Sequence, residues 1–308
     1  FFFAWQVPTS LQAMPPRPLA YCLWGLVAML GSASAGTVTT PPEAPTTSPM
    51  VALTFCCDLQ PPQWSQMLAT LRAHHTNLTA VILESYTITA DGLLVPMAGT
   101  RQANAHVPLL QSLGLKVYGL VPVTAGAIRD ASDAVQAQHL FAEANRVAEV
   151  YRWDGFVLDL EGPISSREQG RAVFHWLNSF ATALHQRSRA LMAFIHECPS
   201  TDFDMSCKWF NSTAALDKLI TMDTYTADPQ HWDRRFQTAA SEMAPQKYAP
   251  GMMYNGNLSP FERGSNHLQY MLKRGVHQFV VWNDAPPNDE YWVLFGRFLA
   301  EARRAPRT

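Results

Sequence analysis

The sequence predicts a single (β/α)8 barrel over residues 51–308. Short apolar segments rich in β-forming residues alternate with longer segments of helical periodicity, as expected for βα units repeated around a parallel sheet. The apolar segments are mostly uninterrupted, which is typical of strands covered on both faces. Eight such units in about 250 residues match the usual size of this barrel, whereas an open doubly wound sheet usually needs fewer strands.

The predicted strands are short and spread over the whole barrel sequence. They are Val51 to Cys56, Ala80 to Glu84, Lys116 to Val121, Gly155 to Glu161, Leu191 to His196, Leu219 to Asp223, Tyr248 to Met253 and Gln278 to Trp282. Three of the segments between them have the length and spacing of amphipathic helices, namely Ala134 to Tyr151, Gln169 to Gln186 and Tyr291 to Arg303. The short interval before the last strand leaves no room for a substantial inserted domain.

The first 50 residues differ in composition from the barrel. An apolar run from Leu19 to Leu30 follows Arg17 and precedes the small residues Ala33-Ser34-Ala35. The run is shorter than the roughly 18 to 20 apolar residues of a spanning helix. We therefore predict a signal peptide over residues 1–35, with an uncleaved signal anchor as the alternative. Residues 36–50 are rich in Thr, Pro, Ser and Ala, which predicts a disordered tail.

A signal peptide implies a secreted or lysosomal glycoprotein. Cleavage would leave Cys56, Cys57, Cys198 and Cys207. An oxidising route permits a Cys198 to Cys207 bridge, while the adjacent pair is equally compatible with distant disulfides and with buried free thiols. The glycosylation tripeptides starting at Asn77, Asn211 and Asn257 agree with secretion.

The overall charge favours a neutral partner. The formal net charge is -2 and the pI is near 6.6, so no broad basic field supports binding to nucleic acid or to an anionic membrane. The sequence has no phosphate-binding glycine loop and no dinucleotide fingerprint, and His196 with Glu197 lacks the spacing of a metal site. We expect a monomer that uses no cofactor and no metal.

Polar residues recur where the predicted strands end. Active sites of (β/α)8 barrels lie at these carboxyl ends. The residues there are Asp58, Glu84, Tyr86, Asp159, Glu161, His196, Glu197, Asp223, Tyr225, Tyr254, Asn255, Trp282, Asn283 and Asp284. Because polar groups are costly to bury unless they are paired, their recurrence at one end predicts a shared functional cleft.

The fourth predicted strand carries the clearest candidates. Residues two apart on a strand share a face, so Val157, Asp159 and Glu161 point the same way. If that way is inward, the two carboxyl groups lie within about 7 Å of each other. Repulsion and desolvation then keep one of them protonated, as cleavage of a glycosidic bond requires. The alternative is an acidic pair that caps helices or binds an arginine.

The run Asp154-Gly155-Phe156-Val157-Leu158-Asp159-Leu160-Glu161 resembles the fourth-strand signature Asp-x-x-Asp-x-Asp-x-Glu of family-18 glycoside hydrolases, the chitinases and chitobiases. The resemblance implies a retaining hydrolase of β-linked N-acetylglucosamine glycans, in which the substrate's own 2-acetamido group is the nucleophile. It implies that Glu161 protonates the leaving oxygen and that Asp159 holds the acetamido group. It further implies that Trp282 forms the hydrophobic floor under the sugar at the cleavage point.

The sequence departs from the family pattern at two places. Val157 replaces the middle acid of the signature, and the sixth predicted strand has Met222-Asp223-Thr224-Tyr225 where the family has Met-x-Tyr-Asp. Either Asp223 or Tyr225 is then the candidate for contact with the acetamido group, and Glu84 and Tyr254 are further candidate substrate contacts. The alternative functions are a chitinase-like lectin without turnover and a barrel hydrolase of another specificity.

Overall fold

The computed structural model describes residues 48–55, 61–89, 91–124, 128, 134–161, 166–195, 215–282 and 288–305. The predicted signal peptide, the predicted tail as far as residue 47 and the cysteines named above lie outside these residues. Met50 already belongs to the first strand of the barrel. Within the described residues, no helix has the length and apolar character needed to cross a membrane.

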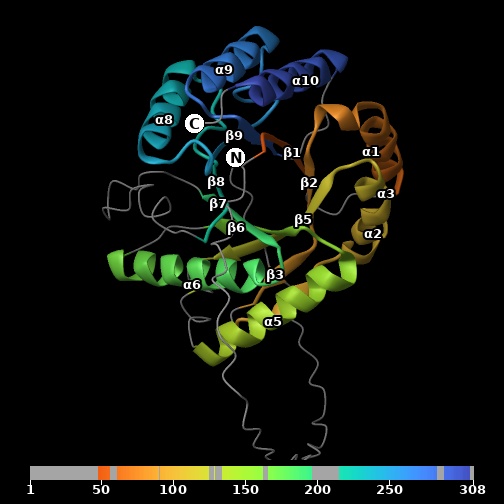
Figure 1. The fold of residues 1–308 in the computed structure, drawn as a ribbon, viewed down its shortest axis with the longest axis vertical. Coiled ribbons are helices and arrows are strands. Elements are labelled where there is room, and N and C mark those ends of the chain that lie inside the picture. The colour runs from red at the N-terminus through yellow and green to blue at the C-terminus, as the bar shows by residue number, and fades with distance from the viewer. Residues whose placement is uncertain are drawn as a thin grey trace, which may run out of the picture. The chain divides into compact units, whose positions relative to one another are not determined.

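Eight parallel strands close into a barrel, which confirms the predicted fold (Figure 1). In sequence order they are β1 (Met50–Phe55), β2 (Ala80–Glu84), β5 (Lys116–Thr124), β6 (Gly155–Glu161), β7 (Ala190–Ile195), β8 (Lys218–Thr221), β9 (Tyr248–Met252) and β10 (Gln278–Val281). Neighbours around the barrel follow this order, and β10 closes the ring by pairing with β1. Each predicted strand overlaps one of these.

Helices surround the ring of strands (Figure 1). They are α1 (Pro61–His74), η1 (His75–Asn77), α2 (Thr100–Ala105), α3 (Val107–Ser112), α5 (Ala134–Tyr151), α6 (Arg167–His185), α8 (Pro229–Glu242), α9 (Phe261–Lys273) and α10 (Asp289–Arg304). The three predicted helices correspond to α5, α6 and α10. A small antiparallel hairpin, β3 (Tyr86–Ile88) with β4 (Leu94–Pro96), was not predicted, because three-residue strands carry too little periodicity.

The strands divide the core into an inner and an outer layer. The inner layer fills the barrel and takes side chains from every strand: Met50, Ala52, Ala80, Ile82, Tyr118, Leu120, Val157, Met192, Phe194, Ile220, Ala249 and Val280. The intervening strand residues, such as Phe156 and Leu158, pack against the helices. Because Val157 belongs to the inner layer, Asp159 and the backbone position of Glu161 fall on the inward face of β6.

Two aspartates just before strands tie neighbouring strands together. The Asp154 carboxylate accepts a hydrogen bond from the Val117 amide at 2.8 Å, and the Asp217 carboxylate accepts one from the Leu191 amide at 2.8 Å. The first acid of the signature therefore has a structural role at the amino end of β6. It joins β6 to β5, which fixes the start of the strand that carries Asp159.

A bulky side chain packs on the outer face of β5 where that strand lacks a side chain. An ideal Cβ at Gly119 would lie 2.2 Å from the Trp153 ring. Trp153 itself is 3% exposed, and its indole nitrogen donates a hydrogen bond to the Asn104 amide oxygen at 2.8 Å. Glycine at position 119 is therefore what allows this ring to approach β5, the strand next to β6, so closely.

We predict that Gly119→Ala destabilises the fold by about 1 to 3 kcal/mol, because the added methyl group overpacks a filled site. Urea unfolding measures the change in the free energy of unfolding. The double variant with Trp153→Leu should show a smaller added cost for the methyl group than the wild-type background does. Equal costs in the two backgrounds would contradict this packing.

Candidate active site at the barrel mouth

The β6 acids lie at the carboxyl end of the barrel. Asp159 is 4% exposed and pairs in register with Pro122 of β5 and Phe194 of β7. Glu161 ends β6 two positions further on, so its backbone stands on the same inward face. The Glu161 side chain lies outside the described part of the structure. The predicted common face of the two acids therefore agrees with the backbone of β6.

A turn at the end of β8 brings Tyr225 to the barrel interior. The strand stops at Thr221, and the Tyr225 amide donates to the Met222 carbonyl at 3.0 Å. The Thr224 hydroxyl donates to the Thr221 and Gly251 carbonyls, each at 2.9 Å, which holds the turn against β9. This turn breaks the alternation that a longer strand would impose. It decides which residue of the Met222–Tyr225 segment enters the site.

Tyr225 lies close to Asp159 and Trp282. Its ring centroid is 6.5 Å from that of Trp282. Burial raises the pKa of the Tyr225 hydroxyl well above its ordinary value, and the negative charge of Asp159 raises it further. The Tyr225 hydroxyl oxygen is buried and has no hydrogen-bond partner among the described residues. It stays protonated at neutral pH and is therefore a ready hydrogen-bond donor.

Asp223 lies just beyond the end of β8 and faces the helix layer. Its side chain is only 5% exposed, and its Oδ2 is 3.8 Å from Nη1 of Arg235 on α8. Burial raises the pKa of Tyr248, which belongs to the outer core, and the charge of Asp223 raises it further. The structure thus brings Tyr225, and not Asp223, into the group at the barrel mouth. The sequence had left both residues open.

Trp282 forms an aromatic corner with Phe194 and Tyr225. It follows the inward residue Val280 by two positions at the end of β10 and packs against the inner layer. Its ring meets Phe194 edge-on, with centroids 5.2 Å apart and an interplanar angle of 87°. Trp282 is partly exposed, so part of it remains available for contact with a ligand.

The other predicted contacts fall on both faces. Glu84 ends β2, and its side chain is half-buried on the inward face shared with Ile82. Tyr254 packs on the helix layer instead, with its ring centroid 5.1 Å from Tyr291 and 6.4 Å from Phe295 of α10. Tyr254 therefore serves the outer core and lies outside the group at the mouth.

Two residues at the mouth were missed by sequence reasoning. An ideal Cβ at Gly251 of β9 would lie 2.4 Å from the Tyr225 ring, so only glycine leaves room for that ring. Thr54 of β1 is 1% exposed, and its hydroxyl has no hydrogen-bond partner among the described residues. A glycine inside a strand pattern is a known sign of close approach and could have pointed to Gly251. Thr54 gives no comparable signal.

Several predicted residues lie outside the described part of the chain: Asp58, His196, Glu197, Asn283 and Asp284. Within the described part, no group of three or more His, Cys, Asp or Glu side chains is arranged to hold a metal ion. Tyr86, the other strand-end aromatic, packs edge-on against Trp153 with centroids 5.9 Å apart.

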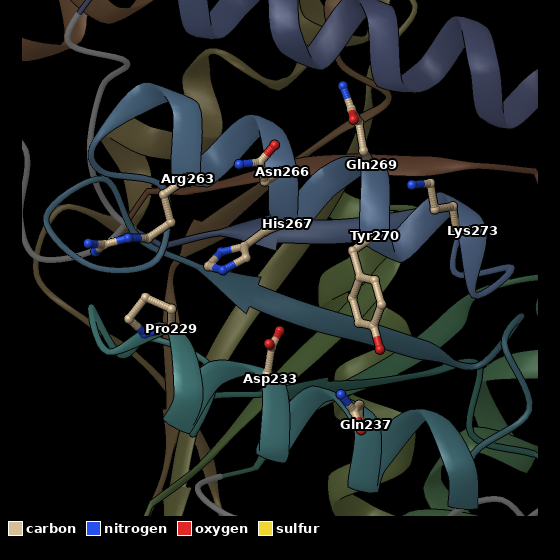
Figure 2. A pocket seen from close by; sticks show the side chains of 9 residues that line it. All are labelled: Pro229, Asp233, Gln237, Arg263, Asn266, His267, Gln269, Tyr270 and Lys273. Carbon is tan, nitrogen blue, oxygen red and sulfur yellow. The ribbon is translucent and has the colours of Figure 1, made fainter.

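A separate hollow of about 710 Å³ lies on the outer surface between α8 and α9 (Figure 2). It is lined by Pro229, Asp233, Gln237, Arg263, Asn266, His267, Gln269, Tyr270 and Lys273. None of the predicted site residues lines it. Because Asp159, Tyr225 and Trp282 come together at the carboxyl end of the barrel, the candidate active site is the barrel mouth and not this groove.

The fold is that of a chitinase-like (β/α)8 barrel. No family model and no curated protein matches the sequence. The chain is similar to the chitinase from Chromobacterium violaceum ATCC 12472, at 14% identity and a TM-score of 0.66 over 82% of this chain and 99% of that one. It is also similar to the C-terminal domain of a putative chitinase from Desulfitobacterium hafniense DCB-2, at 13% identity and a TM-score of 0.69 over 82% and 99%.

A third similar structure holds a ligand. It is a mutant class V chitinase from Nicotiana tobaccum in complex with NAG4, at 12% identity and a TM-score of 0.66 over 83% of this chain and 100% of that one. At such identities the likeness establishes a common fold. A common fold does not by itself define a common reaction.

We predict that Tyr225→Phe leaves the ligand-free protein as stable as the wild type or stabilises it by up to about 1 kcal/mol, because it removes a buried hydroxyl that has no partner in the described part of the chain. Tyr248→Phe is the matched control. The Tyr248 hydroxyl is buried and lies 3.3 Å from the Thr221 hydroxyl, so its loss should cost about 1 kcal/mol. Urea unfolding compares the two variants, and a Tyr225→Phe cost as large as that of the control would contradict the prediction.

Proposed function

We propose that this protein is a retaining glycoside hydrolase that cleaves β-linked N-acetylglucosamine glycans, such as chitin or chito-oligosaccharides, by substrate-assisted catalysis. The observation that carries the proposal is the convergence of Asp159, Tyr225 and Trp282 at the mouth of a chitinase-like barrel. The NAG4 bound to the tobacco chitinase supports the choice of an N-acetylated sugar as substrate. The predicted signal peptide would direct the enzyme to the secretory pathway.

In the proposed reaction Glu161 acts first as an acid and then as a base. Its carboxyl proton moves to the glycosidic oxygen while the acetamido oxygen of the same sugar attacks the anomeric carbon. The bond to the leaving sugar breaks, and a cyclic intermediate forms in which the acetamido oxygen is bonded to the anomeric carbon. A water molecule then gives a proton to Glu161 and attacks the anomeric carbon, which breaks the bond to the acetamido oxygen and restores the acetamido group. Two displacements at the same carbon retain its configuration.

The buried neighbours of Glu161 would orient the acetamido group. Asp159 would bind its N–H, and the protonated Tyr225 hydroxyl would donate to its carbonyl oxygen. Both groups are already buried in the ligand-free protein, so they would be aligned without further loss of water. The partly exposed face of Trp282 would support the sugar ring through apolar contact.

Val157 distinguishes this chain from the family pattern. It is fully buried in the inner layer, where the signature has a second carboxyl group next to Asp159. A valine at this position offers Asp159 neither a proton nor a hydrogen bond. We therefore expect a slower enzyme than one with the complete signature, since Val157 cannot share a proton with Asp159 or stabilise its charge.

We predict that Glu161→Gln lowers kcat for chito-oligosaccharides by about 100-fold or more, because the amide is isosteric but cannot donate the proton. Product release is measured by chromatography. Glu168→Gln is the control, since Glu168 lies exposed in the first turn of α6. If Glu161→Gln cleaves the substrate at the wild-type rate, the assignment of Glu161 as the acid is wrong.

The lectin remains the second candidate because Val157 removes an acid of the signature. A lectin would bind chito-oligosaccharides without cleaving them, whereas the proposed enzyme does both. In either case Trp282→Ala should weaken binding about 10-fold or more by removing apolar contact with the sugar. Calorimetric titration of the Glu161→Gln background measures this loss. If neither binding nor cleavage occurs in the wild type, the N-acetylglucosamine assignment is wrong.

A further inference from the structure

We propose that Asn257 is a positioning residue that locks the segments after β8 and β9 together and thereby holds Tyr225 in the barrel mouth. Its effect on catalysis rests on the function proposed above, whereas its effect on the position of Tyr225 does not. Asn257 itself lies in the segment after β9 and is fully buried.

The Asn257 side chain connects two loops. Its Oδ1 accepts a hydrogen bond from the Met253 amide at 2.8 Å, within its own loop. Its Nδ2 donates to the Thr224 carbonyl at 2.6 Å and to the Gly251 carbonyl at 3.0 Å. The Thr224 carbonyl belongs to the peptide bond that leads into Tyr225. One amide group thus joins the turn after β8 to the end of β9 and to the loop that follows.

The pattern of partners accounts for the residue type. The site presents one backbone donor and two backbone acceptors, and a carboxamide supplies one acceptor and two donors in the matching geometry. Aspartate would place a charged carboxylate against two carbonyl oxygens in a buried site. Asn257 also begins a predicted glycosylation tripeptide. Because its side chain is fully buried and hydrogen-bonded at both ends, the fold does not present this asparagine to solvent.

The backbone of Asn257 is anchored to the helix layer. His267 of α9 donates from Nδ1 to the Asn257 carbonyl at 2.9 Å. Figure 2 shows this imidazole extending from α9 toward α8, where it stacks on Trp232 with centroids 3.8 Å apart and an interplanar angle of 11°. Burial lowers the pKa of His267, which favours the neutral ring that keeps a proton on Nδ1. The loop after β9 is therefore bonded to the turn after β8 and to the end of β9 through the Asn257 side chain, and to α9 through the Asn257 carbonyl.

Close packing passes this constraint on to Tyr225. An ideal Cβ at Gly256, next to Asn257, would lie 2.2 Å from the Tyr225 carbonyl oxygen, and one at Gly251 would lie 2.4 Å from the Tyr225 ring. The two glycines allow the Tyr225 backbone and ring to rest directly on the β9 segment. A shift of that segment would therefore shift Tyr225, which has no hydroxyl partner of its own among the described residues.

The test compares Asn257→Asp and Asn257→Ala with a matched control, Asn104→Asp. Asn104 is also buried, donates to the Thr100 carbonyl at 2.8 Å and accepts from Trp153 at 2.8 Å. Neither of these hydrogen bonds involves Tyr225. We therefore expect Asn104→Asp to lower the stability of the fold without moving Tyr225. His267→Phe is a milder variant, because it keeps a ring against Trp232 but removes the bond to the Asn257 carbonyl.

Two readouts are measured on each folded variant. The first is the 19F NMR spectrum of protein labelled with 3-fluorotyrosine, in which the Tyr225 resonance is assigned by its loss in Tyr225→Phe. We expect this resonance to shift or broaden in the Asn257 and His267 variants and to stay unchanged in Asn104→Asp. The second is chito-oligosaccharide cleavage. We expect kcat to fall on the order of 10- to 100-fold in the Asn257 variants, with KM changed less than about 3-fold.

The outcomes separate the two proposals. If the wild type cleaves nothing but the Tyr225 resonance moves as expected, the proposed function fails and the positioning role stands. If the resonance stays in place in folded Asn257 and His267 variants, the positioning role is wrong, whatever the activity. If the control variant loses kcat to the same degree, the effect is one of general stability, and the proposal is overturned as well.

Discussion

The alternation of side chains on eight parallel strands that close into a barrel is the constraint on which the rest of the structure depends. Closure leaves no free edge, so each strand residue points either to the narrow interior or to the helix layer. Once Val157 fills the inner layer, Asp159 has to follow it inside at the carboxyl end. The same constraint places Trp282 above Val280 and Glu84 above Ile82. The candidate site is thus the top of the packed core, where apolar residues give way to polar ones.

That transition has an energetic cost that a purely structural barrel would avoid. Burying a polar group without a hydrogen-bond partner is unfavourable. The Thr54 and Tyr225 hydroxyls are both buried, and neither has such a partner among the described residues. Buried polar atoms without partners also occur elsewhere in the described residues, for example the indole nitrogens of Trp176 and Trp232. What distinguishes the mouth is that the Tyr225 hydroxyl lies close to the buried Asp159 and that the Tyr225 ring lies close to the partly exposed Trp282. This combination is typical of a site that binds a ligand.

The segment after β8 shows how local backbone geometry can decide a functional question. Strand alternation alone allows Met222 and Thr224 on one face and Asp223 and Tyr225 on the other. A turn that starts at Met222 separates the latter pair, so that Asp223 meets Arg235 on α8 while Tyr225 enters the barrel. The turn depends on contacts to β9 and to the loop beyond it. A residue-by-residue match to the family pattern could not have revealed this arrangement.

The sequence by itself determined the barrel, its strands to within a few residues and the inward face of β6, because these follow from local periodicity. It also pointed to Trp282 at a strand end. Only the tertiary structure decided between Asp223 and Tyr225, placed Tyr254 in the helix layer, and revealed the roles of Gly251 and Asn257. The physical reason is that these residues act through contacts between segments far apart in the sequence. Periodicity records which face of its own strand a residue occupies, whereas such contacts depend on what the neighbouring strand and helix present to it.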